Sequence, residues 1–588
     1  MRAALLAAAL LLPIPAAAAE PARDPALHAL FDREFRRGLD EFPERATFLG
    51  IEGYDERLAD RSPSAVARRK AHARELVGEL ERFDPARLSA QDRISREVAL
   101  YNARLDVEEN AIYGDLPFSV TDSFMPVSST GGPHSGLVNL AKATRFRTER
   151  DYENYLKRLD AVPRLIEQHI ATMRAGMKSG WMPPAEAMTK AAAQFALFAA
   201  ADAKATPLWR PFAEFPRDVP EARRARLAQR GEEALSKKVH PAFAELKRFV
   251  EAEYLPLARK PLGAITLPGG ERYYDVRVRR NTTTTLKAEE IHRIGLAEVA
   301  RIRAEMDKVI ASTGHKGTFA EFVQFVNSDP RFFFASAAER LAAYRDIAKR
   351  ADAELPRLFA ELPRAPYGIR PMEAYEGDNA DNYSRPAIDG SRAGFFNANV
   401  NNLKDRPSYE MEAVLLHETV PGHHLQIARQ QELKDLPLFR RSSGYVAYSE
   451  GWGLYAETLG YEMGFYKDPY MHFGALWAEA MRACRLVIDT GIHTKGWGRE
   501  QSIRYMMDNA GLKPGFATSE IDRYINTPGQ ALGYKIGELR IKAMRAKARE
   551  ALGERFDLRR FHNAVLDDGP LPLTVLESRI DEWIDKQR

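Results

Sequence analysis

Long stretches of this sequence place apolar residues three and four positions apart, which constrains the chain to a mainly helical fold. This spacing puts the apolar side chains on one face of an α-helix. It recurs over residues 26–42, 65–83, 151–177 and 337–359. Alternating, β-rich segments are fewer, at residues 271–286 and 392–400. We therefore predict a mainly α protein with a small β-sheet.

Two irregular stretches interrupt the helical pattern, at residues 117–136 and in the Gly-, Asn- and Asp-rich segment 376–392, and we predict loops there. No linker rich in Ser, Gly or Pro marks a domain boundary. We expect one continuous body, with an N-terminal helical half at residues 20–270 and a C-terminal half at residues 271–588 that holds the chemistry.

The first 19 residues are typical of a secretory signal peptide. One Arg precedes an apolar run that ends in small residues at 17–19, which predicts cleavage before Glu20. Pro13 and Pro15 interrupt the run, and it is short for a membrane span. We expect a periplasmic or secreted protein with no membrane span after signal removal. Cys484, the single Cys of the chain, excludes an intramolecular disulfide, and no Cys follows the run for lipid attachment.

The overall charge argues against nucleic acid as a partner. The chain has 86 Lys and Arg against 82 Asp and Glu, a formal net charge of +4. So small a surplus, spread over the whole chain, produces no field that would attract a polyanion.

The segment 417–424, HETVPGHH, concentrates residues that bind metal ions. Three of the 13 His residues lie here beside Glu418. Zinc binds imidazoles and carboxylates and, in catalytic sites, keeps one position for water. In the common HExxH motif two His residues four positions apart share a helical face, and the Glu acts as a base on the bound water. Here Pro421 stands where the second His would be.

A straight helix would not bring these His residues together. His423 would be turned about 120° from His417, and His424 would lie about 10 Å along the axis. However, Pro421 has no N–H to donate to the His417 carbonyl, and its ring clashes with that carbonyl. Gly422 permits the backbone angles of a bulge. We therefore predict a helix break, with a two-residue insertion before the second ligand, for which the spacing leaves His423 and His424 as alternatives.

Five segments resemble a bacterial family catalogued as domain of unknown function 885 (DUF 885). They are residues 389–392, 417–426, 448–457, 485–493 and 527–537. The family resembles gluzincin zinc metallopeptidases and is similar in helical architecture to thimet oligopeptidase and Taq carboxypeptidase. The resemblance implies a large helical metallopeptidase-like fold with a small β-sheet beside the active-site helix, and Zn²⁺ as the cofactor, although another divalent ion remains an alternative.

The resemblance also implies a set of metal ligands. Gly422-His423-His424-Leu425 aligns with the Gly-His-x-Leu of those enzymes, which makes His423 a ligand beside His417 and leaves His424 for the surroundings of the metal or for substrate. A gluzincin takes its third ligand from a later helix, and Glu450 is our candidate. Glu457, seven residues on and on the same face, would then hold a ligand His through its second ring nitrogen.

The expected mechanism is hydrolysis by a metal-activated water. Glu418 would be the general base, and the metal would polarise the substrate carbonyl. Tyr534 is the first candidate to stabilise the oxyanion, with His493 and His424 as alternatives.

Other residues are candidates for binding substrate. The strand 395–400 could be an edge strand that pairs with substrate backbone, with Asn397 or Asn399 capping that contact; a β-turn pair of Asn residues is the alternative. Arg482 and Arg485 could bind a substrate carboxylate, or at least one could pair with an acid such as Glu479 or Asp489.

We expect an exported zinc-dependent hydrolase of the metallopeptidase class that acts on short peptides or small amides. A zinc amidase or esterase with a non-peptide substrate uses the same chemistry. A non-catalytic exported binding protein with a degenerate metal site is the third interpretation, and Pro421 is its support. Against it, a structural zinc site needs four protein ligands and no adjacent base, whereas Glu418 directly follows His417.

Overall fold

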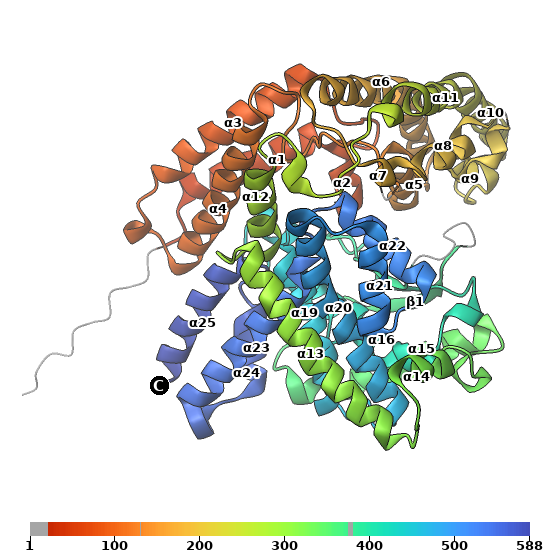
Figure 1. Ribbon diagram of the computed structural model, residues 1–588. Helices are drawn as coiled ribbons and strands as arrows, with labels where there is room; N and C mark the ends of the chain where they lie inside the picture. The colour runs from red at the N-terminus through yellow and green to blue at the C-terminus, as the bar shows by residue number, and fades with distance from the viewer. Residues whose placement is uncertain (1–21, 130, 201, 374–379) are drawn as a thin grey trace, which may run out of the picture.

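The computed structural model describes residues 22–129, 131–200, 202–373 and 380–588 (Figure 1). The predicted signal peptide, residues 1–19, lies outside the described residues. Residues before 260 form α1 (Pro25–Glu41), α2 (Pro43–Leu49), α3 (Pro63–Glu81), α4 (Ala90–Tyr113), α5 (Pro133–Ala143), α6 (Glu149–Ser179), α7 (Ala185–Met188), α8 (Ala191–Ala199), α9 (Arg210–Ala213), α10 (Glu221–Ala234) and α11 (His240–Phe249). Later residues form α12 (Gly270–Thr282), α13 (Ala288–Ser312), α14 (Phe319–Val326), α15 (Ala337–Leu358), α16 (Met411–Glu418), α17 (His423–Glu432), α18 (Leu438–Ser442), α19 (Val446–Glu462), α20 (Pro469–Lys495), α21 (Arg499–Ala510), α22 (Pro514–Asn526), α23 (Leu532–Leu552), α24 (Leu558–Leu566) and α25 (Leu573–Gln587).

The four helices predicted from apolar spacing are confirmed as α1, α3, α6 and α15. Their ends follow ordinary capping chemistry. Asp24, for example, accepts hydrogen bonds from the backbone N–H groups of Ala26 and Leu27, directly before the Pro that opens α1. The mainly α fold class is therefore correct.

The β-strand predicted at residues 271–286 is wrong, because most of this segment is the helix α12. The alternation of Tyr274, Val276 and Val278 suggested a strand, yet α12 packs against α4 on one side and α23 on the other, so residues on several of its faces are buried. The hydroxyl of Tyr274 also donates to Asp489 of α20, at 2.6 Å. Tertiary packing thus overrides the β propensity of the individual residues.

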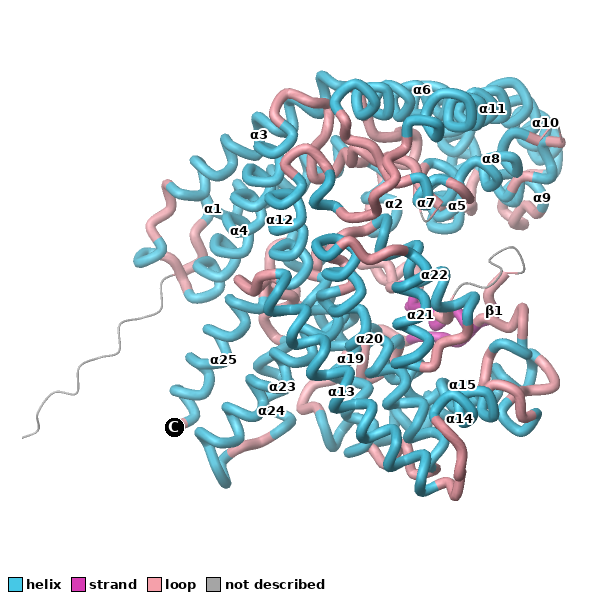
Figure 2. Tube along the Cα trace, in the orientation of Figure 1, coloured by secondary structure: helices cyan, strands magenta, loops and turns pink. Residues whose placement is uncertain are grey.

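The sheet has three short strands, β1 (Tyr367–Pro371), β2 (Asn382–Ser384) and β3 (Gly394–Ala398), drawn in magenta in Figure 2. The strand predicted at residues 392–400 is confirmed as β3. The loop predicted at residues 376–392 is wrong at 382–384, which form β2. Since β3 lies between β1 and β2, hydrogen-bonded to both, the expectation that it is an edge strand open to substrate is also wrong.

Two large cores hold the helices together. One gathers buried apolar residues between Ile94 and Ile584, and the other lies within the N-terminal half, between Leu58 and Tyr254. In Figure 1 the helices α3 to α11 arch over the C-terminal helices. There α13 packs along α20 and α19 along α23, while α16 lies against α19. Within the described residues, no helix combines the length and apolar character that crossing a bilayer requires.

A pair of glycines allows α19 and α23 to cross closely. A Cβ atom added at Gly451 would lie 2.5 Å from the Cα of Gly537, closer than real Cβ atoms approach backbone. Only glycine fits at such a crossing. The contact brings the start of α23, with Tyr534, toward the segment of α19 that carries Glu450.

Candidate metal centre

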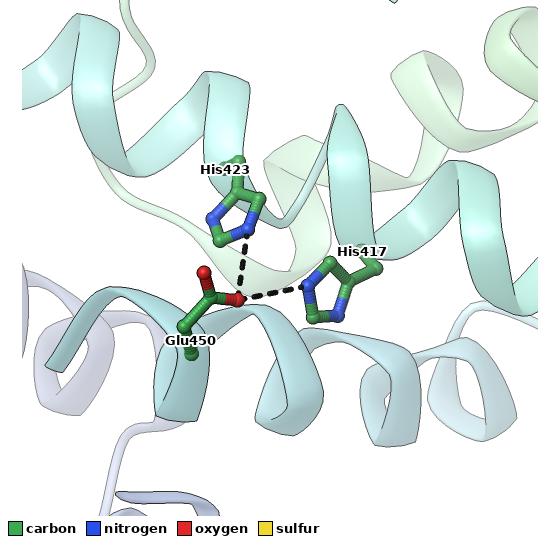
Figure 3. Close-up of side chains that lie close together, drawn as sticks. All are labelled: His417, His423 and Glu450. Carbon is green, nitrogen blue, oxygen red and sulfur yellow. Dashed lines mark ion pairs between the residues drawn. The ribbon is translucent and has the colours of Figure 1, made fainter. Parts of the chain in front are cut away.

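The predicted break at Pro421 is present, between α16 and α17 (Figure 3). Gly422 donates its N–H to the Leu416 carbonyl at 3.0 Å, and a Cβ atom there would lie 2.0 Å from the His417 oxygen, so no other residue fits. The indole N–H of Trp452 in α19 donates to the Pro421 carbonyl at 2.9 Å. The small size of Gly422 and the hydrogen bond from Trp452 of α19 therefore hold the backbone in this turn.

The break brings three metal-binding side chains together, and we call them the triad: His417 from α16, His423 from α17 and Glu450 from α19. Figure 3 shows both imidazoles turned toward the same carboxylate oxygen. The Oε2 atom of Glu450 lies 3.4 Å from Nε2 of His417 and 3.3 Å from Nε2 of His423. Their donor atoms all lie within 4.8 Å of one another.

These separations fit a shared ion better than direct hydrogen bonds. Charge-assisted N–H···O bonds are usually about 2.7–2.9 Å long. By contrast, two ligands about 2.05 Å from a tetrahedral zinc ion are about 3.3 Å apart. The donor set, two imidazoles and one carboxylate with a fourth position left open, is also that of catalytic rather than structural zinc sites. The residues therefore fit a tetrahedral divalent ion.

A second carboxylate orients the His417 ring. Glu457, two turns after Glu450 on α19, places Oε1 2.7 Å from Nδ1 of His417, and the Arg482 guanidinium lies 3.3 Å from the same oxygen. Nδ1 of His417 is thus paired with Glu457, and Nε2 of the same ring faces Glu450. This is the usual arrangement behind a metal-ligating His.

Gly453 is a functional position that the sequence reasoning missed. A Cβ atom there would lie 2.8–3.1 Å from the His417 ring, so the imidazole rests directly on the backbone of α19. Gly453 lies between Glu450 and Glu457, at intervals of three and four residues that put all three on one helical face. That spacing was a usable signal for it.

The electrostatics of the site reflect two carboxylates facing two imidazoles. Burial alone would lower the pKa of His417, but Glu450 and Glu457 raise it to about 9. Burial would raise the pKa of Glu450, yet His423 and His417 hold it well below its usual range. The Glu450 carboxylate thus faces two imidazoles, and a cation that binds the triad would displace any protons that the imidazoles carry.

Glu418 lies beside the triad. Its carboxylate is half-buried and forms no hydrogen bond or ion pair with any residue that the structure describes. Burial raises its pKa, and the nearby His423 and His417 partly oppose this. A carboxylate in this state is available to accept a proton.

Tyr534 lies near Glu450, half-buried at the start of α23. Burial raises the pKa of its hydroxyl, and the neighbouring Glu450 carboxylate raises it further, so the hydroxyl stays protonated. The guanidinium of Arg485 lies 4.2 Å from the centre of the ring. Tyr534 is therefore a proton-bearing donor close to the triad.

His424 and His493, the alternatives to Tyr534, have both ring nitrogens engaged elsewhere. His424 contacts the Tyr383 hydroxyl at 2.8 Å and the Ala365 carbonyl at 3.0 Å, so it points toward the sheet. His493 accepts from the Ala264 N–H at 3.2 Å and bonds the Tyr524 carbonyl at 3.1 Å. Neither His has a free nitrogen to offer a substrate oxygen.

The expected pairing of Arg482 or Arg485 with an acid is confirmed for both residues, but the two acids named as examples are not the partners. Arg482 pairs with Glu457 and Arg485 with Glu520, the latter at 2.6 Å. The predicted acids have other partners, since Glu479 pairs with Lys535 and Asp489 accepts from Tyr274. Each Arg thus pairs with a carboxylate of the protein, while Nε of Arg482 and Nη1 of Arg485 have no hydrogen-bond partner among the described residues.

The two Asn residues proposed for substrate contact serve the sheet and the turn after it. The Asn397 side chain accepts from Arg370 Nε at 2.7 Å and donates to Ser384 Oγ at 2.8 Å. Asn399 is fully buried, and its side-chain oxygen accepts the N–H of Asn401 at 2.9 Å. The turn interpretation therefore describes Asn399 better than a substrate cap does.

Comparison with known proteins places the chain in a family. Residues 43–580 match the family described as "Bacterial protein of unknown function (DUF885)". No curated protein matches the sequence. Among solved structures, one described as a putative lipoprotein from Colwellia psychrerythraea is 29% identical, with a TM-score of 0.89, over 95% of this chain and 99% of that chain.

Two further solved structures are less similar to this chain. A putative lipoprotein of unknown function from Shewanella oneidensis is 17% identical, with a TM-score of 0.71, over 94% of this chain and 99% of that chain. A structure described as PZ peptidase A with an inhibitor is 11% identical, with a TM-score of 0.34, over 89% of this chain and 97% of that chain. The first of these shares the fold; the second likeness is too low to support an argument about function.

Proposed function

The chain belongs to the DUF885 family, and we propose that it is an exported zinc-dependent hydrolase, a peptidase that acts on short peptides or small amides. The observation that carries this proposal is the triad. Its two separations of 3.4 Å and 3.3 Å match the edges of a zinc coordination tetrahedron, and Glu418, a carboxylate with no partner among the described residues, lies beside it. A purely structural zinc site would need a fourth protein ligand and no such base.

The roles of the side chains follow from their positions. A bound zinc ion would supply a more acidic water and polarisation of the substrate carbonyl. Glu418 would accept the proton of the attacking water and later pass it to the leaving amine, as general bases in hydrolases do. Tyr534 would donate a hydrogen bond to the oxygen of the tetrahedral intermediate. Glu457 would hold His417 in place throughout.

Metal removal tests the proposal directly. We expect the mature protein to hydrolyse members of a library of short peptides, to lose this activity on treatment with a chelator, and to regain it when about one equivalent of Zn²⁺ is returned. Product release would be followed by mass spectrometry. Cleavage that is equally fast in the chelated protein would contradict the proposal. Hydrolysis of aryl esters or non-peptide amides with no peptide cleavage would keep the metal chemistry but change the substrate.

We expect Tyr534→Phe to lower kcat by about 100-fold while KM changes little, because removal of one oxyanion donor costs about 10²–10³ in kcat. Steady-state kinetics on a cleaved peptide would measure both constants. Tyr461→Phe is the control for loss of a tyrosine hydroxyl, since Tyr461 is 45% exposed and belongs neither to the triad nor to the groups proposed to contact substrate. A rise in KM with unchanged kcat would instead assign Tyr534 to substrate binding.

A further inference from the structure

A cavity of about 780 Å³ lies apart from the triad. One wall comes from the N-terminal half, from α2, residues 119–126 and α5, and another from residues 525–528 at the end of α22. No triad residue lines it. Its volume is that of pockets that enclose small ligands.

Much of the wall is aromatic. Tyr113, Phe124 and Tyr273 line the cavity on one side and pack around Trp181, whose ring centre lies 4.9 Å, 5.2 Å and 5.6 Å from theirs. Phe42 lines it from the N-terminal half. These faces offer an apolar ligand group a large contact area.

Most charges in the wall are already neutralised by the protein. Arg61 pairs with Asp122 at 3.1 Å, and Arg277 with Glu109 at 3.5 Å. Arg259 is held by hydrogen bonds to backbone carbonyls, among them that of Met182 at 2.8 Å. These groups require no charged ligand.

Arg45 and Glu44 have no partner of opposite charge among the described residues; Glu44 accepts the N–H of Ala59 at 2.9 Å. Arg45 is exposed and lines the cavity; its guanidinium donates to the Ser442 hydroxyl at 3.3 Å and lies over the Phe35 ring, and it pairs with no carboxylate of the described residues. Arg385, just after β2, likewise forms no hydrogen bond or ion pair within the described part of the chain. The pKa of the Arg45 guanidinium is lowered, first by the surrounding protein and then by the positive charge of Arg385. Arg45 and Arg385 are both exposed and neither has a carboxylate partner among the described residues, so an anion can reach and pair with them.

Two neutral polar groups of the wall also lack partners. Asn526 is 5% exposed, and its side-chain oxygen accepts no hydrogen bond from a residue that the structure describes. The His169 ring, 8% exposed, forms no hydrogen bond with a described residue, and burial lowers its pKa to about 3, so it is uncharged at neutral pH. Buried polar groups are normally satisfied. An amide group, which both donates and accepts, would suit an amide oxygen and a neutral imidazole.

We propose that this cavity binds the carboxyl end of an apolar peptide, with the carboxylate on Arg45, the last side chain against the aromatic wall and an amide group toward Asn526 and His169. An N-acyl aromatic amino acid carries the same chemistry. That the bound peptide is a substrate rests on the proposed peptidase function, whereas the binding of the peptide does not.

Calorimetric titration of the purified mature protein with N-acetyl-phenylalanine tests this, before and after chelator treatment. We expect one molecule to bind per chain in both states. The uncharged amide of the same compound, and the Arg45→Gln variant with the acid, should each bind about 10- to 100-fold more weakly, as expected for loss of a charged hydrogen-bonded pair. A blocked dipeptide ending in Phe compared with N-acetyl-phenylalanine distinguishes a peptide end from an acyl amino acid.

The matched variants are Gly136→Phe and Gly78→Phe. Both glycines lie within helices, α5 and α3, and a Cβ atom at either meets nothing within 4 Å. Only Gly136 lines the cavity, so Gly136→Phe should abolish binding and Gly78→Phe should not. Should Gly136→Phe fail to fold, Arg45→Gln and Arg68→Gln, an exposed Arg of α3, give the same comparison.

Two results would overturn the proposal. One is no binding to wild type at millimolar ligand. The other is binding that disappears with the metal or in His423→Ala, yet survives in Gly136→Phe, because the carboxylate would then lie on the metal. Since the expected binding does not need the ion, a failed hydrolase proposal and a failed cavity proposal give different results.

Discussion

Glu418→Gln is expected to lower kcat for peptide hydrolysis by about 10³-fold while zinc stays bound. Gln keeps the size and a hydrogen-bonding oxygen but cannot accept a proton, and general base catalysis contributes about 10²–10⁴-fold. The triad does not include Glu418, and Glu418 forms no hydrogen bond that holds the fold within the described residues. Zinc content by mass spectrometry and kcat on one peptide would be measured on the same preparation.

The control is Glu97→Gln, which removes an exposed carboxylate of α4 without a described partner. It should leave both zinc content and kcat unchanged. If Glu418→Gln retained zinc and full activity, another group would have to take the proton, and the proposed mechanism would be wrong. If it lost zinc, Glu418 would be part of metal binding instead.

Local rules predicted the most unusual feature of the site. The absence of an N–H on Pro421 and the small size of Gly422 are properties of single residues, so the break after α16 could be predicted without any knowledge of the fold. The same holds for Glu450 and Glu457, whose relation depends only on the pitch of one helix. These predictions needed no information from distant parts of the chain.

Features that depend on distant contacts could not be predicted in this way. The segment 271–286 has the composition of a strand, and its helical form depends on burial between α4 and α23. The partner of Arg485 is Glu520, 35 residues away on α22, whereas the prediction considered only acids close in sequence. Strand order is also a tertiary property, and the adjacency of β3 to both β1 and β2 is not encoded in the pattern of residues 394–398.

The choice of His423 or His424 as the second ligand also depends on distant contacts, and the structure distinguishes the surroundings of the two residues. His423 points to Glu450, and its Nδ1 atom is buried with no hydrogen-bond partner in the described part of the chain. His424 is buried on the opposite side and joins Tyr383 of β2 to the Ala365 carbonyl. One His thus belongs to the triad and its neighbour to the contact between α17 and the sheet.

His423→Ala is therefore expected to weaken zinc binding by about 100- to 1,000-fold, whereas His424→Ala should retain one zinc per chain. Structural zinc sites bind with about 10–16 kcal/mol, or roughly 3–4 kcal/mol for each of four ligands, which corresponds to the stated loss. His424→Ala should instead lower the free energy of unfolding of the metal-free protein by about 2–4 kcal/mol, because it leaves the Tyr383 hydroxyl and the Ala365 carbonyl without a partner. Competition with a chromogenic chelator and denaturant unfolding would measure the two quantities. The opposite pattern, with zinc lost in His424→Ala and kept in His423→Ala, would mean that the helix break presents the other His to the ion and that the triad is not the metal centre.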